Sequence, residues 1–111
     1  MNENQNCNGE QPQKEKQIAP LNLTHPYRIN ENYFIRTVTF HYTSKLIAVF
    51  EHEIVLASAA WIPDDGRFAD ALKTGNFNEV EPYPMDENVI LGRGAIVDAT
   101  IFNCPLPDKQ K

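Results

Sequence analysis

The feature that most constrains the fold is the stretch 89–102, in which two apolar runs flank a Gly-Arg-Gly segment. Aliphatic and β-branched residues favour the extended backbone of a strand, and glycine is permissive in a turn. In the second run Val97, Ala99 and Ile101 alternate with polar residues, which is the pattern of a strand with one buried face. The stretch therefore predicts a hairpin, with Arg93 at the apex of its turn and directed at solvent or at another molecule.

Three more strands are predicted upstream of this hairpin. Residues 33–42, 45–50 and 54–61 are rich in aromatic, aliphatic and β-branched residues. Only short polar segments, at 43–44 and 51–53, separate them. Strands joined by such short turns form an antiparallel meander.

A short helix is predicted after the third strand, where Phe68 and Leu72 share one apolar stripe at helical spacing. One of the two aspartates at 64–65 would cap its start, and Gly75 stands just past its end. Two helical turns are marginal on their own, so the stripe must pack on the strands. We expect Trp61, Phe68 and Leu72 to form this seam between helix and barrel.

A further brief strand is predicted at 76–81. The sequence thus predicts five or six short, strongly bent strands within about 75 residues, which is typical of a small barrel. The predicted fold is mostly β: a small five-stranded barrel with one short α-helix inserted between strands 3 and 4. We place this domain at 25–104, after a polar arm at 1–24 that is predicted to be disordered and before a polar tail at 105–111.

The charge of the chain restricts its partners. The net charge is −5, and the stretch from His25 to Asn103 carries all of it, with 6 basic and 11 acidic residues. An acidic body argues against wide, sequence-independent binding of duplex nucleic acid, because such binding neutralises phosphates with Lys and Arg. A small basic spot at Arg93 remains compatible with this balance.

Two cysteines, Cys7 and Cys104, stand near opposite ends of the chain. Cysteines so far apart do not indicate a disulfide framework, and a reducing cytoplasm fits them best. The first 17 residues lack the apolar segment of a signal peptide, and no run approaches the roughly 18 apolar residues of a membrane helix. We therefore expect a cytoplasmic protein without membrane contact.

Two blocks resemble the Sm-like family, whose fold is an SH3-like barrel. The block 42–61 is similar to the first half of that fold, and Ile90-Leu91-Gly92-Arg93-Gly94-Ala95-Ile96-Val97 is similar to the family's second motif. The resemblance implies a five-stranded bent sheet, rings built by pairing edge strands, and RNA bases bound near the pore. It also implies that Arg93 lines a nucleotide pocket with a residue of the turn after the second strand, which here reads Glu51-His52-Glu53 without the family's Asn.

A second resemblance covers most of 33–111. The segments 59–68, 78–82 and 92–99 look like a group of small uncharacterised proteins of phages and prophages. We therefore expect a non-enzymatic, ring-forming interaction or assembly protein of prophage origin, with copies of itself or another phage protein as partners. The alternative is an Sm-like module that binds RNA or single-stranded nucleic acid through Arg93, Gly92, Gly94 and His52.

Other chemistries are disfavoured by the sequence. His41, His52 and neighbouring glutamates lack the spacing of a metal site, and residues 64–67 lack the alternating oxygen ligands of a calcium loop, so no metal or cofactor is expected. Of the aromatic residues in the first predicted strand, at least half must be core, because side chains alternate between its faces. No nucleophile elbow, phosphate loop or Cys/His pair is present, so we expect no enzyme.

Overall fold

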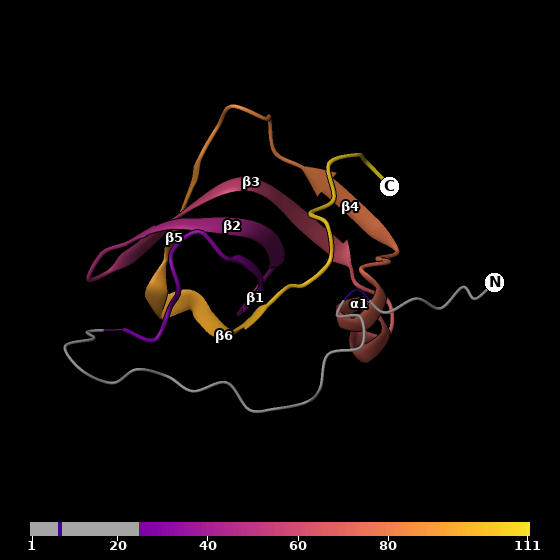
Figure 1. Cartoon of the computed structure of the whole chain (residues 1–111), viewed down its shortest axis with the longest axis horizontal. Coiled ribbons are helices and arrows are strands. Elements are labelled where there is room, and N and C mark those ends of the chain that lie inside the picture. The colour runs from indigo at the N-terminus through magenta and orange to yellow at the C-terminus, as the bar shows by residue number, and fades with distance from the viewer. Residues whose placement is uncertain (1–6, 8–24) are drawn as a thin grey trace.

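The computed structural model describes Cys7 and residues 25–111. Within them the chain is mostly β, as predicted, with one antiparallel sheet of six strands (Figure 1). The elements in chain order are β1 (Asn32–Thr37), β2 (His41–Val49), β3 (Glu53–Asp64), α1 (Phe68–Thr74), β4 (Glu79–Pro82), β5 (Val89–Gly92), the 3-10 helix η1 (Arg93–Ala95) and β6 (Ile96–Ile101). Apart from Cys7, the predicted N-terminal arm lies outside the described residues.

The sheet has the order β4-β3-β2-β1-β6, and β5 also pairs with β3. This is possible because β3, with 12 residues, is long enough for two partners placed end to end. Its first part, 53–56, pairs with β5, and its last part, 60–64, pairs with β4. Within the described residues β5 and β6 do not pair, so they do not form the predicted hairpin and the sheet is not closed. The sheet has six strands, in place of the predicted five-stranded barrel.

The first turn of the meander lies elsewhere than predicted. β1 ends at Thr37, whose hydroxyl donates to the carbonyl of Phe40 at 2.6 Å and accepts from the amide of Phe40 at 2.9 Å. The side chain thus closes the turn at 38–39. The predicted turn residues Thr43 and Ser44 are instead fully buried in the middle of β2. The sequence predicted a turn here because both side chains are short and polar. Only the tertiary structure shows that they are buried.

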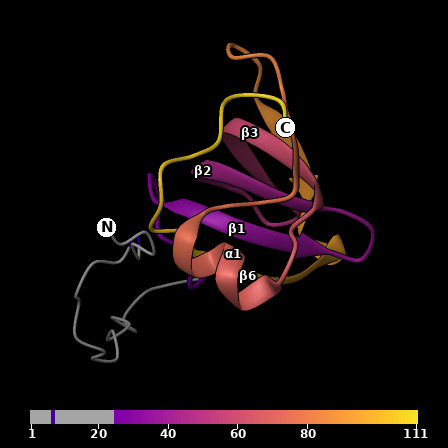
Figure 2. The ribbon, with the colours of Figure 1, turned by 90° about the vertical axis from the view of Figure 1, so that its right-hand side faces the viewer.

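The sheet is buried on both faces along β1, where Tyr33, Phe34 and Ile35 are all covered. On one face Tyr33 and Ile35 join a cluster completed by Tyr42, Leu46, Ile54, Leu56 and Ala59. On the other face Phe34 joins a cluster with residues of β3, α1, β4, the loop between α1 and β4, and the C-terminal segment. These residues are Ala60, Ile62, Ala71, Phe77, Val80, Phe102 and Cys104. Figure 2 shows α1 lying across β1 on this second face.

Helix α1 ends as predicted and begins differently. Gly75 adopts φ 73°, the left-handed conformation that favours glycine, and its amide donates to the carbonyl of Ala71. The residue before the helix is Arg67, without a side-chain capping hydrogen bond, so the predicted aspartate cap is wrong. Asp64 instead accepts from the amide of Gly66 at 2.9 Å, and Asp65 contacts His41.

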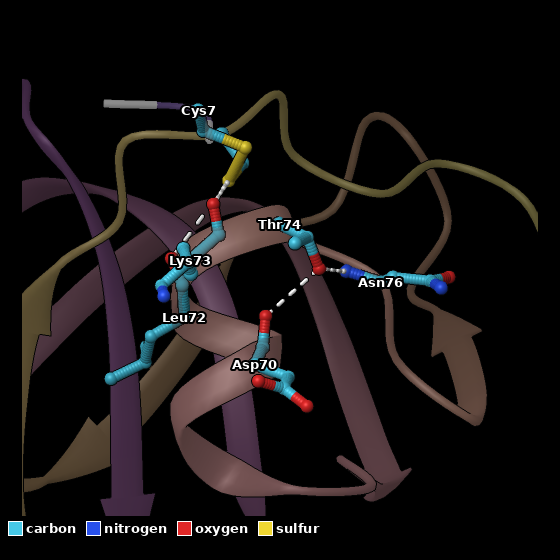
Figure 3. The surroundings of a disulfide bond; sticks show 7 residues. Cys7, Asp70, Leu72, Lys73, Thr74 and Asn76 are labelled. Atoms are coloured by element: carbon cyan, nitrogen blue, oxygen red, sulfur yellow. Dashed lines mark hydrogen bonds between the residues drawn. A yellow bond between two sulfur atoms is a disulfide. The ribbon is translucent and has the colours of Figure 1, made fainter. Parts of the chain in front are cut away.

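Cys7 and Cys104 form a disulfide beside the C-terminal end of α1 (Figure 3). The amide of Cys7 donates to the carbonyl of Lys73 at 2.9 Å, which seats this residue on the helix end. The prediction of unpaired cysteines is therefore wrong, because the fold brings positions 97 residues apart to a Cα–Cα distance of 4.8 Å. The cytoplasmic location stays a prediction that has lost this support.

Candidate functional site

The site begins at η1, the short connection between β5 and β6. The amide of Arg93 donates to the carbonyl of His52, and its guanidinium Nη1 donates to the carbonyls of Phe50 at 2.8 Å and Glu51 at 3.3 Å. The side chain thereby ties η1 to the turn between β2 and β3. Arg93 is at the predicted turn, but its guanidinium is directed at the neighbouring turn as well as at solvent.

An aromatic ring lies under this arginine. The guanidinium carbon of Arg93 is 5.8 Å from the ring centre of Tyr27, a distance at which a cation is attracted to a ring face. Tyr27 in turn contacts Tyr33 edge to face, with ring centres 5.9 Å apart. The hydroxyl of Tyr33 accepts from the amide of Arg28 at 2.9 Å, so the segment before β1 is held against the sheet.

These groups line a surface groove of about 760 Å³. The groove runs along β6 and is bounded by the segment 26–28 and by the turn between β2 and β3. Its lining comprises Pro26, Tyr27, Arg28, Tyr33, Glu51, His52, Arg93, Gly94, Ile96, Val97, Asp98, Ala99 and Ile101. We call it the β6 groove.

Three of the four residues predicted for a nucleotide pocket, Arg93, Gly94 and His52, line the β6 groove together. Gly92 does not line it, because this residue lies in β5 opposite Glu53. Neither Gly92 nor Gly94 has a positive φ, and a methyl group added at either would meet nothing within 4 Å. The prediction that these glycines permit an unusual turn is therefore wrong, since η1 is a 3-10 turn that other residues also adopt.

The charges in the β6 groove balance. Arg28 and Arg93 contribute two positive groups, and Glu51 and Asp98 contribute two negative groups. Asp98 is itself engaged, since Arg36 donates two hydrogen bonds to its carboxylate. These bonds hold the pKa of Asp98 below its ordinary value and raise that of Arg36. Taken by themselves, the lining residues therefore supply no excess of positive charge that would attract a phosphate backbone.

The predicted helix seam is only partly realised. Leu72 packs against the cluster around Phe34, and Phe68 is 40 % exposed with its ring centre 5.9 Å from that of Phe34. Trp61 is not in the seam: it lies opposite Tyr42 in β2 and packs edge to face on Phe40. Because neighbours alternate along a strand, Trp61 points away from the face that α1 covers.

The histidines stand apart from one another. His41 lies 3.2 Å from a carboxylate oxygen of Asp65, and His52 is exposed at the β2–β3 turn near Glu51. Within the described residues no group of three or more His, Cys, Asp or Glu side chains is placed to hold a metal ion.

The sequence prediction missed Tyr27, Arg28 and Asp98 as groove residues. A Tyr-Arg pair next to a proline was the available signal, but nothing in the local sequence relates this pair to Arg93 or to β6. Only the pairing of β6 with β1 brings Asp98 and the segment 26–28 to one surface.

The fold defines a small, mostly β domain built on one open antiparallel sheet. No model of a protein family matches the chain, and no curated protein and no solved structure is significantly similar to it. The resemblances to the Sm-like family and to the phage group therefore stay predictions. Among the described residues, no helix has the length and apolar character needed to cross a membrane.

Proposed function

We propose that this protein is a non-enzymatic interaction and assembly module that associates with copies of itself through the edges of its open sheet. The observation that carries the proposal is the outer edge of β5. Within the described residues this edge has no backbone partner, and the strand, Val-Ile-Leu-Gly, contains no charge and no proline. Monomeric proteins commonly protect the edges of their sheets with charged residues or proline, and an unprotected apolar edge pairs with another chain.

Side-chain exposure supports the same edge. Ile90 is 71 % exposed, and on the outer face of the sheet it continues a cross-strand row formed with Val55 and Ala48. On β6, which also ends the sheet, Val97 is 58 % exposed. A strand from a second copy would extend the sheet and cover these apolar side chains.

The edge of β4 provides a contrast. There the backbone amides and carbonyls of Val80 and Lys111 exchange two hydrogen bonds, at 2.9 and 3.0 Å, so the C-terminal segment covers this edge. In the part of the chain that the structure describes, the edges at β5 and β6 are thus the ones left open for assembly.

The proposal includes a fold assignment. The strands pair in the order β5-β3-β2-β1-β6, and the three-residue turn η1 joins β5 to β6. This arrangement supports an SH3-like or Sm-like architecture. In that assignment α1 and β4 form an insertion after the third strand. Rings built by pairing β5 of one copy with β6 of the next follow from it.

A second candidate function is the binding of RNA or single-stranded nucleic acid in the β6 groove. The specific observation in its favour is that Arg93, His52 and Gly94 line one groove with the ring of Tyr27, which offers a surface for stacking a base. The balanced charge of the groove places it second.

Light scattering coupled to size-exclusion chromatography, with absorbance at 260 and 280 nm, tests both functions. We expect a species several times heavier than 12.7 kDa with the absorbance ratio of protein alone. Ile90→Lys should dissociate it, because the lysine charge is costly in a strand interface. The matched control is Val38→Lys, which adds the same charge at an exposed apolar residue in the β1–β2 turn and should leave the assembly intact.

Three other outcomes are informative. A monomeric wild-type protein overturns the assembly function. Dissociation by Val38→Lys as well as by Ile90→Lys shows that charge, and not the β5 edge, controls association. Absorbance at 260 nm that nuclease removes favours the second candidate.

A further inference from the structure

A second, smaller pocket lies away from the β5 and β6 edges. It has a volume of about 360 Å³ and is formed where three separate segments meet: the middle of β3, the loop after β4 and the C-terminal segment. Its lining consists of Ser58, Ala59, Pro82, Tyr83, Met85, Leu106, Pro107 and Asp108. We call it the C-terminal pocket. In Figure 1 the loop that forms one wall protrudes at the top of the molecule, between β4 and β5.

The walls of this pocket are held in place. On one side the amide of Tyr83 donates to the carbonyl of Ala59 at 2.9 Å, and its ring stacks on Tyr42 at 6.4 Å between centres. On the other side Leu106 packs against the core, between the disulfide-bonded Cys104 and the end of the chain that pairs with β4. These two parts of the wall are therefore in place before a ligand binds, which lowers the entropic cost of filling the pocket.

The lining of the pocket contains a strained residue. Ser58 has φ 54°, a left-handed conformation that is costly for a residue other than glycine. It lies where the register between β2 and β3 shifts, so β3 bulges at this point. Strain of this kind is found preferentially at functional positions.

The chemistry of the lining indicates the ligand. The walls are apolar, and Asp108 is the one charged residue among them. The surroundings are acidic, because residues 74–92 contain four carboxylates and no Lys, Arg or His. The nearby Lys111 is directed elsewhere, since its ammonium group contacts the side chain of Asn76 at 2.7 Å. Lys109 lines a different depression, formed with Gly75 and Val80.

We propose that the C-terminal pocket binds a basic side chain, Lys or Arg, presented by a partner polypeptide. The aliphatic stem of that side chain lies between Met85 and Pro107, and its charged end reaches the carboxylate of Asp108. Met85 is 81 % exposed and has an unbranched, flexible side chain, so it adapts to the ligand as it becomes covered. This function involves neither β5 nor β6 and does not depend on self-assembly.

Methyl NMR on the full chain tests the proposal directly. The sequence has two methionines, Met1 and Met85, so ¹³C-methyl labelling gives only two resonances, and that of Met85 comes from the pocket lining. The probes are N-acetyl-arginine amide and N-acetyl-lysine amide, and N-acetyl-norleucine amide is the uncharged comparison. We expect the basic amides to shift the Met85 methyl resonance saturably and the norleucine amide to shift it much less.

Two variants test the contribution of the Asp108 charge. Asp108→Asn should weaken the binding of the basic amides by about three- to fivefold, the effect of removing one exposed ion pair. Asp70→Asn is the matched control, because Asp70 is an exposed carboxylate on α1 outside the pocket, and it should leave binding unchanged. The proposal is overturned if the Met85 resonance does not move, if norleucine amide binds equally well, or if Asp108→Asn has no effect.

Discussion

Replacing Gly75 with alanine is expected to lower the free energy of unfolding by about 3 kcal/mol, through two separate effects. The first is conformational. Gly75 terminates α1 at φ 73°, and an L-residue with a side chain adopts this conformation at a cost of about 1 kcal/mol or more.

The second effect is steric. A methyl group at Gly75 would lie 2.8 Å from Cβ of Cys104 and 3.0 Å from its sulfur, whereas carbon atoms in contact are normally about 3.5–4.0 Å apart. Cys104 is 3 % exposed and is held by its disulfide, so it has little room to move. Overpacking of this kind costs about 1–3 kcal/mol.

Two other glycines provide controls for each effect. Gly66 has φ 72°, but a methyl group there would meet only the exposed side chain of Asn78, at 3.2 Å, so Gly66→Ala should cost about 1 kcal/mol. Gly94 has neither a positive φ nor a neighbour within 4 Å, so Gly94→Ala should change stability by less than about 0.5 kcal/mol.

Urea unfolding followed by circular dichroism measures all three variants, and the order of cost should be Gly75, Gly66, Gly94. For a domain of this size, 3 kcal/mol corresponds to a fall in Tm on the order of 15 °C. Equal costs at Gly75 and Gly66 would refute the steric effect. A large cost at Gly94 would refute the whole argument.

Three further predictions concern the groove, the disulfide and the ion pair. Arg93→Ala should lower the free energy of unfolding by about 1 kcal/mol, because it removes partly exposed, charge-assisted hydrogen bonds to the β2–β3 turn. Unchanged urea unfolding would contradict this structural role. Weaker nucleic-acid binding by the same variant would support the second candidate function. Reducing the disulfide between Cys7 and Cys104 should lower the free energy of unfolding by about 3–5 kcal/mol, because this bond closes a loop of nearly the whole chain. Unfolding with and without dithiothreitol measures the difference. The stability of Cys7→Ser should not depend on the reductant. The lowered pKa of Asp98 means that its pairing with Arg36 stabilises the fold above pH 3.8 and ceases to do so as the pH falls through the folded-state value. The stabilities of wild type and Asp98→Asn should therefore differ at pH 7 and converge once the pH has fallen below the lowered pKa of Asp98, and a constant difference would exclude the linkage.

Much of the fold was predictable because it follows from local sequence patterns. Alternating apolar residues indicated β6, and the helical spacing of Phe68 and Leu72 with Gly75 behind them indicated α1 and its end. The first turn was not predictable in the same way. Residues 37–44 are all compatible with a strand, and the hydroxyl of Thr37 decides which of them turn.

The candidate site was predictable only as single residues. Arg93 stood out between two glycines, but the sequence did not show that its guanidinium binds the carbonyls of a turn more than 40 positions away. Nor did it show that Asp108 and Ser58 share a pocket. Contacts of this kind depend on strand pairing and on the path of the C-terminal segment.

By itself, the sequence determined that this protein is a mostly β domain with one short helix and an acidic surface. These properties follow from local propensity, apolar periodicity and composition, which act over a few residues or over the whole chain. The tertiary structure alone decided that, among the described residues, β5 and β6 end the sheet without a further partner, that Cys7 meets Cys104, and that the β6 groove and the C-terminal pocket form. The physical reason is that each of these features joins segments far apart in sequence, and their contact depends on how the whole sheet twists and pairs.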